Sequence, residues 1–313
     1  MDYGKILRRA FHITLRYKAL WLFGFVLALL DSGGNFGQSF QYSFGDGPSM
    51  PGALPSPEIA AGVIIAIIAL GLLLGLLVVV LNLVCHAALI GMVNEIEEDE
   101  KTSIRGGFKI GLARTITLFL IRLVIGIPAF AVALFLILLG LSPLLLLFVD
   151  NTAAKVIGVG LAVGLLLVVL GVIILGALVL SVAWEFIDRF CVIERRGVFD
   201  SIKGGFGYIR RNLARVGLAW LLMLVVGIGW GLVMLLLVLL LILLVAGPAL
   251  VTYLATNALG PTLLVAVPLG LIAVLVLAFV GGLMVVFRSG FWTLTYLGLK
   301  SLSLPSAPAV TAP

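Results

Sequence analysis

The chain has 313 residues, of which 63% are hydrophobic and only 11% are charged. A soluble domain carries roughly 25% charged residues, and its core could not bury so much apolar surface. A bilayer can accommodate this surface, because about 20 consecutive apolar residues in a helix cross a hydrocarbon layer of ~30 Å. The composition therefore excludes a soluble protein and predicts an integral membrane protein. The long apolar runs do not alternate with polar residues, so they predict helices rather than a membrane barrel.

The formal net charge of +6 comes from basic residues that gather at the ends of the apolar runs. Because anionic headgroups lie at that depth, we expect anionic membrane lipids as partners and no nucleic acid. The cysteines Cys85 and Cys191 lie far apart and have no disulfide or metal-ligand spacing. His12 and His86 are the only histidines, which excludes a histidine-rich metal site. We expect no metal and no cofactor.

Residues 2–17 have basic residues at every fourth position with apolar residues between them. This spacing predicts an amphipathic helix in the membrane interface. The apolar run 19–30 follows, and it can be interpreted as the hydrophobic region of a signal peptide. No A-x-A cleavage site precedes Asp31, however, and the segment matches two later internal copies. We therefore expect a short first span that reaches the interface through its flanking basic residues.

Residues 31–57 form the longest polar segment, which is rich in Gly, Ser and Pro and has no basic residue. We expect an extracytoplasmic loop. It is either solvated or folded over the outer face of the helices through its aromatic residues.

Five long apolar runs predict the remaining spans: 59–93, 115–148, 154–183, 218–245 and 261–287. The acidic residues 94–101 are expected to extend the second span into water, and Pro128 to kink the third. A mixed-charge connector is expected at 185–196, an uncharged loop at 247–260 and a disordered tail at 301–313.

A short motif occurs three times. It is clearest as Ser201-Ile202-Lys203-Gly204-Gly205-Phe206, stands 98 residues earlier as Ser103-Ile104-Arg105-Gly106-Gly107-Phe108, and is fainter as Ile6-Leu7-Arg8-Arg9-Ala10-Phe11. Each copy opens a basic segment that leads into an apolar span; we name the segments 5–16, 105–114 and 203–215 the elbows. The repeats would cover 4–100, 101–198 and 199–300. The Gly-Gly pairs would let an elbow approach a neighbouring helix or bend at the interface.

The predicted fold is therefore an all-α integral membrane protein in a single membrane domain. Six transmembrane helices would form three parallel repeats, each an amphipathic interfacial helix followed by a helical hairpin, packed with pseudo-three-fold symmetry.

Six spans place both termini on one side, and 19 of the 20 Lys and Arg residues then fall on that side. The positive-inside rule makes both termini cytoplasmic, in a bacterial plasma membrane. Four tryptophans near the same boundary agree with this orientation: Trp21, Trp184, Trp220 and Trp292. The basic residues predicted to bind lipid headgroups are Arg8, Arg9, Arg105, Lys109, Lys203, Arg210, Arg211 and Arg215.

Few polar residues lie inside the spans, where an ionisable group is by default a candidate for function. Asn82 and His86 share a helix face beside Cys85, and Arg122 lies about two turns into the third span. These three, Asn82, His86 and Arg122, form a possible intramembrane polar site. The alternatives are core packing for Asn82 and His86 and snorkelling for Arg122.

The end of the fourth span carries Glu185, Asp188 and Arg189, for which we expect a helix-end ion pair. No catalytic motif occurs, so no catalytic residue is predicted. The absence of carboxylates in the middle of the spans disfavours an ion-coupled pump.

The elbow that begins at Ser201 and continues to Arg211-Asn212-Leu213, together with Ala19-Leu20-Trp21-Leu22-Phe23-Gly24, resembles a loose group of bacterial membrane proteins. These are uncharacterised proteins that resemble the glycerophosphodiester phosphodiesterase membrane domain. The resemblance implies a location and a fold type. It implies no phosphodiesterase activity, because the catalytic barrel that some of those proteins carry is not in this sequence, and it transfers no active-site residue.

We expect a non-enzymatic accessory or scaffold protein that organises lipid or stabilises a membrane protein partner. The alternative is a transporter or channel for a lipid-like or small apolar solute. A lipid-modifying enzyme would need its polar groups gathered at one depth; the available residues are Asn82, His86, Arg122, Glu185 and Asp188.

Overall fold

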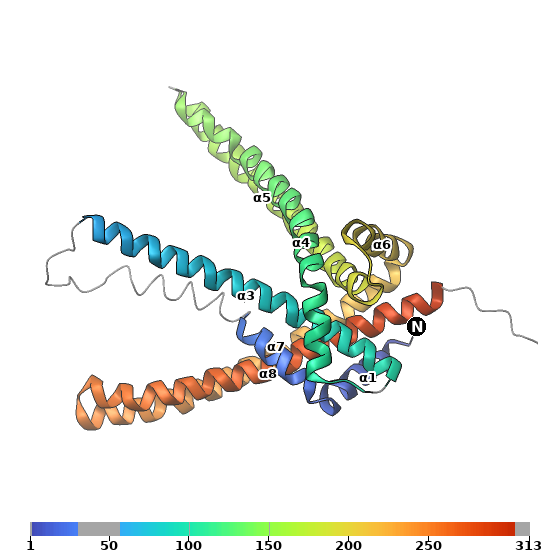
Figure 1. The fold of residues 1–313 in the computed structure, drawn as a ribbon. Coiled ribbons are helices and arrows are strands. Elements are labelled where there is room, and N and C mark those ends of the chain that lie inside the picture. Colours follow the sequence, from blue (N-terminus) through green and yellow to red (C-terminus); the bar gives the residue numbers. More distant parts are fainter. Residues whose placement is uncertain (1, 31–56, 100, 150, 304–313) are drawn as a thin grey trace, which may run out of the picture. The chain divides into compact units, whose positions relative to one another are not determined.

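A computed structural model describes residues 2–30, 57–99, 101–149 and 151–303 (Figure 1). All regular secondary structure in these ranges is helical. Five of the described helices are long and apolar enough to cross a membrane, or six if a bent pair at the N-terminus counts as one span. The predictions of an all-α fold and of a multi-pass membrane protein are therefore confirmed. Of the predicted loop 31–57, residues 31–56 lie outside the described ranges.

The helices, in chain order, are α1 (Tyr3–Arg16), Ala19–Leu30, α3 (Pro57–Asp99), α4 (Ile104–Leu141), the 3-10 helix η1 (Ser142–Phe148), α5 (Thr152–Ile193), α6 (Val198–Arg211), α7 (Leu213–Thr256) and α8 (Leu259–Ser303). The starts of α1 and α5 have side-chain caps, which satisfy backbone N–H groups that have no partner inside the helix. Asp2 accepts from the N–H of Lys5 at 3.2 Å, and Asn151 accepts from the N–H of Ala153 at 2.9 Å.

The first elbow and the short apolar helix after it are separate elements. α1 and Ala19–Leu30 meet at an angle of 94°. The indole N–H of Trp21 donates to the carbonyl oxygen of Thr14 at 2.6 Å across this bend. The prediction of two segments here is confirmed.

Other predicted boundaries are wrong. The second elbow is no separate helix, because residues 104–114 are the first turns of α4. The loop predicted at 247–260 is mostly helix; α7 continues to Thr256 and α8 begins at Leu259. The connector predicted at 185–196 is helical up to Ile193. The tail predicted at 301–313 is helical up to Ser303, and the rest lies outside the described residues.

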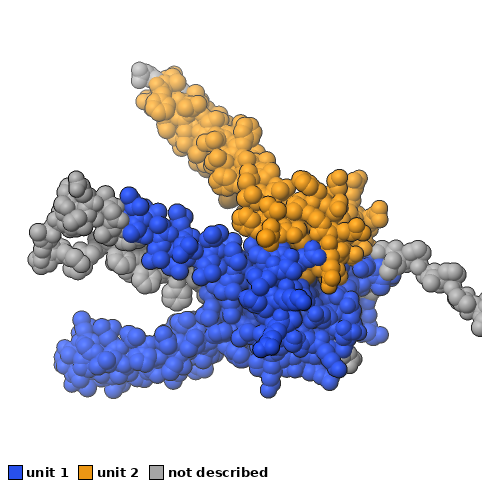
Figure 2. Space-filling model, viewed as in Figure 1, with its two compact units in different colours: residues 1–115, 214–313 blue, residues 116–213 orange. Residues whose placement is uncertain are grey.

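The chain forms two compact units, residues 1–115 with 214–313 and residues 116–213 (Figure 2). In the first unit the helix Ala19–Leu30 packs against α8 at two glycines. A Cβ at Gly24 would lie 2.5 Å from the carbonyl oxygen of Gly282, and a Cβ at Gly282 would lie 2.7 Å from the backbone nitrogen of Phe25. Glycine is therefore required on both helices for the backbones to approach this closely.

α3 has an exposed part and a buried part. Its residues from Ile68 to Val80 are exposed, whereas nearly every residue from Leu83 to Val93 is buried. The buried part packs against the first turns of α4, where Gly111 lies against the backbone of Val84. Only the half of α3 near its acidic end therefore belongs to the packed core of the first unit.

In the second unit α4 and α5 run antiparallel. Gly140 of α4 lies against Leu166 of α5, where an added Cβ would be 2.9 Å from the leucine Cδ2. At the other end of the pair, Arg122 faces Asp188. Only 6% of the most apolar stretch of each helix is buried. Such surfaces suit a hydrocarbon surrounding.

Candidate functional site

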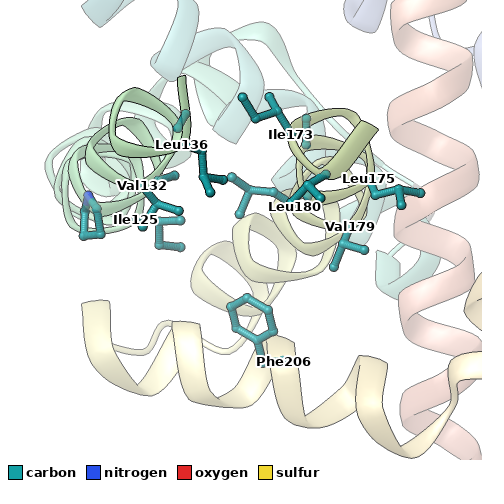
Figure 3. Close-up of a pocket in the computed structure, with 14 residues that line it drawn as sticks. Ile125, Val132, Leu136, Ile173, Leu175, Val179, Leu180 and Phe206 are labelled. Carbon is teal, nitrogen blue, oxygen red and sulfur yellow. The ribbon is translucent and has the colours of Figure 1, made fainter. Parts of the chain in front are cut away.

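The second unit contains an open apolar cavity of about 800 Å³ between α4 and α5, and several of its lining side chains are more than half exposed. Figure 3 shows Ile125, Val132 and Leu136 of α4 facing Ile173 and Leu180 of α5 across it. All lining residues are apolar. The cavity therefore suits hydrocarbon, whereas a polar group placed there would lose its hydrogen bonds to water without replacement.

Phe206 is the one lining residue that comes from an elbow. Its ring points from α6 toward the cavity (Figure 3). The preceding residue explains this position: a Cβ at Gly205 would lie 2.6 Å from Cγ1 of Ile187, so glycine lets α6 lie directly on α5. Gly204 lies against the ring of Phe190. For this Gly-Gly pair, the predicted close approach to a neighbouring helix is confirmed.

Four charged residues lie at one end of the same helix pair. Glu185 and Arg189 form an ion pair of 2.7 Å, with Arg189 only 2% exposed. This confirms the predicted helix-end ion pair. Arg122 of α4 lies 3.8 Å from Asp188 of α5, which is 7% exposed. Sequence spacing gave no reason to pair these two residues, because 66 positions separate them.

The Arg122–Asp188 pair is loose. Its 3.8 Å separation exceeds the length of a hydrogen bond. Among the described residues the guanidinium of Arg122 has no hydrogen-bond partner, and 40% of its side chain is exposed. The Oδ1 atom of Asp188 is buried and, within the same ranges, also lacks a partner. Arg122 therefore keeps donor groups available for an additional acceptor.

Asn82 and His86 lie on α3 in the first unit. Both side chains are half-buried and both have interaction partners, while Cys85 between them is buried. These observations favour the core-packing alternative for Asn82 and His86. Arg122 belongs to the second unit and is paired there with Asp188. In the described ranges, no group of three or more His, Cys, Asp or Glu residues could hold a metal ion.

Seven of the eight basic residues predicted to bind headgroups are exposed: Arg8, Arg105, Lys109, Lys203, Arg210, Arg211 and Arg215. The eighth, Arg9, is used inside the first unit. Its Nε donates to Oε1 of Glu97 at 2.8 Å and ties α1 to the end of α3.

Each elbow also exposes a phenylalanine at the last position of the repeated motif. Phe11 is 58% exposed, Phe108 45% and Phe206 42%. Sequence reasoning included these residues in the motif but assigned them no role. These phenylalanines occupy the same position in the three copies of the motif, and this repetition is the signal that could have assigned them a role.

Comparison with known proteins adds a family to this description. No curated protein and no solved structure matches the chain. The model of DUF7544, a family of unknown function, matches residues 8–301. This match says nothing about the resemblance to the glycerophosphodiester phosphodiesterase membrane domain. The matched region covers nearly the whole chain, and the protein therefore belongs to DUF7544.

Proposed function

We propose that this protein is a non-enzymatic membrane protein that organises anionic lipid at the cytoplasmic leaflet of a bacterial plasma membrane. The elbows provide the contacts. The observation that supports this proposal most directly is a shared arrangement: in each elbow a small buried residue packs on another helix, and the next residue is an exposed phenylalanine.

The three small residues are Ala10, Gly107 and Gly205. Ala10 is fully buried, and its Cβ lies 3.8 Å from the position of a Cβ at Gly290 of α8. A Cβ at Gly107 would lie 2.9 Å from Cγ of Met92 on α3. Gly205 lies on Ile187 of α5 in the same manner. One face of each elbow is thus fixed to the protein.

The exposed residues of each elbow include an aromatic ring and cations. On α6 these are Phe206, Lys203, Arg210 and Arg211, all exposed. A helix of this kind places its apolar side chains below the headgroups and its cations among them. Each cation near an anionic leaflet contributes about 1 kcal/mol, and salt weakens the attraction.

The proposed orientation has one further support. Residues from both ends of the described chain line a common pocket of about 450 Å³, with Asp2 and Lys5 on one side and Gly298 and Ser301 on the other. Both ends therefore lie on the same side of the first unit. Together with the distribution of Lys and Arg residues, this favours cytoplasmic termini and three parallel repeats.

The test compares two pairs of exposed arginines. In Arg210→Glu/Arg211→Glu the elbow loses two cations, and in Arg195→Glu/Arg196→Glu the same charge is changed outside the elbows. At about 1 kcal/mol per cation, the elbow variant should bind phosphatidylglycerol ~30-fold more weakly at that elbow. Native mass spectrometry with a titration of phosphatidylglycerol measures this binding. Equal affinity in the two variants would contradict the proposal.

A second candidate function is passage of a lipid-like or small apolar solute. The apolar cavity between α4 and α5 favours it, because such a cavity accepts hydrocarbon. Flux of a fluorescent lipid across vesicles that contain the purified protein tests this alternative, with protein-free vesicles as the control.

A further inference from the structure

We infer that the cavity between α4 and α5, together with Arg122, is a binding site for one glycerophospholipid. One acyl chain would occupy the cavity, and the lipid phosphate would lie on the guanidinium of Arg122. The inference rests on the proposed function in that it assigns a specific lipid site to a protein that is held to organise anionic lipid.

The dimensions and lining of the cavity fit an acyl chain. Its volume of about 800 Å³ lies within the range of roughly 300–1,000 Å³ for small-molecule sites. Its lining on α4 extends from Ile125 to Leu136, which corresponds to about 17 Å of helix length. A long and apolar space of this kind accepts hydrocarbon and rejects polar solutes. In a membrane, acyl chains are the most abundant occupant of that type.

The position of Arg122 fits the phosphate. Arg122 lies three residues before Ile125, so the two side chains share a face of α4 and are about one turn apart. Its partner Asp188 follows Ile187, on which Gly205 of α6 packs. Arg122 therefore stands at the end of the cavity that is nearer to α6. A lipid whose chain enters the cavity would carry its phosphate to this depth.

The chemistry of Arg122 supports the same contact. A guanidinium has five N–H donors and binds phosphate with two parallel hydrogen bonds. Asp188 is the only ion-pair partner of Arg122 in the described chain, and at 3.8 Å it accepts no hydrogen bond from it. Asp188 thus holds the guanidinium in place while leaving its donors for the ligand. The exposed Lys203 on α6 adds positive charge on the helix that carries Phe206.

The test uses the full chain in dodecyl maltoside micelles, which contain no phosphate, with a phosphatidylglycerol probe that carries a photoreactive diazirine on one acyl chain. We expect saturable labelling of one probe per chain, with cross-links on the parts of α4 and α5 that line the cavity. Labelling spread evenly over α7 and α8 would overturn the inference.

Two glycines on α5 give a matched pair of variants. Gly176 lines the cavity, whereas Gly171 does not, and a Cβ at either position would meet nothing within 4 Å. Gly176→Leu should fill the cavity and lower labelling at least tenfold, while Gly171→Leu should leave it unchanged. Equal labelling of the two variants would exclude the cavity as the site of the acyl chain.

The phosphate contact has its own comparison. A diacylglycerol probe with the same diazirine lacks the phosphate, and it should label the unaltered protein at least tenfold less than phosphatidylglycerol does. In Arg122→Gln/Asp188→Asn the two probes should label equally. The double variant is used because removal of Arg122 alone would leave Asp188 as a buried charge without this counterion. A preference for phosphatidylglycerol that survives in this variant would overturn the role of Arg122.

The elbow variant Arg210→Glu/Arg211→Glu separates this inference from the proposed function. If it binds lipid normally while Gly176→Leu loses labelling, the cavity site stands and the elbows do not organise lipid. If the elbow variant loses lipid while Gly176→Leu and Gly171→Leu label equally, the proposed function stands and the cavity site is wrong.

Discussion

Replacement of Gly282 by alanine tests the packing of the helix Ala19–Leu30 on α8. The new methyl group would lie 2.7 Å from the backbone nitrogen of Phe25 and 2.9 Å from the carbonyl oxygen of Gly24. An ordinary contact begins at 3.4 Å, so the helices must separate by about 0.7 Å at the closest atom. Both atoms belong to backbone, which no rotamer change can move.

Overpacking of this kind costs typically 1–3 kcal/mol, and we expect about 2 kcal/mol for Gly282→Ala. The matched control is Gly281→Ala. There the nearest atom is Cβ of Ala28 at 3.8 Å, which is an ordinary contact, so the stability should remain nearly unchanged.

The buried cysteines Cys85 and Cys191 provide the assay. A thiol-reactive fluorophore reacts with these cysteines only when the protein unfolds. The rise of its fluorescence with temperature therefore gives the melting temperature of the protein in detergent. Gly282→Ala should melt below both Gly281→Ala and the unaltered protein. If the two variants melt at the same temperature, the helix Ala19–Leu30 does not approach α8 at this glycine.

Two further predictions concern contacts that the elbows make. Gly205→Ala should destabilise the second unit by about 1–3 kcal/mol, because its methyl group would overlap Ile187. The control is Gly207→Ala, whose methyl group would meet nothing within 4 Å and which should be neutral in the same melting assay. A double-mutant cycle of Arg9→Gln and Glu97→Gln should give a coupling energy of about 0.5 kcal/mol, because both side chains are partly exposed and solvent screens the pair. A coupling energy above about 2 kcal/mol would show that the pair is buried in the membrane-bound protein.

Hydropathy predicted the spans well where charged residues mark their ends. The acidic residues after Val93 continue α3 to Asp99, as expected. The loop predicted at 247–260 is wrong because Pro248 does not end a helix. In a membrane protein, proline is tolerated inside an apolar helix, and Pro248 and Pro268 both lie inside helices here.

The candidate site was harder to predict. The Arg122–Asp188 pair and the cavity depend on which helix lies next to α4, and hydropathy contains no information on neighbours. The close approach of α6 to α5 could be predicted, since the Gly-Gly pair of Gly204 and Gly205 recurs in the motif. Sequence alone could not show that Phe206 faces a cavity.

The packing of α1 on α8 has a consequence for biosynthesis. The first turns of α4 and the helix α6 each follow the helix on which they pack, so their partners are already made when they leave the ribosome. α1 packs beside Gly290, about 280 residues after Ala10. At roughly 5–20 residues per second, α1 waits on the order of 15 to 60 s for its partner. During that time the face formed by Ala10, Ile13 and Thr14, which is buried in the finished protein, lacks its cover. A chain whose synthesis stalls before α8 would therefore keep this face exposed, whereas a chain that includes α8 would bury it.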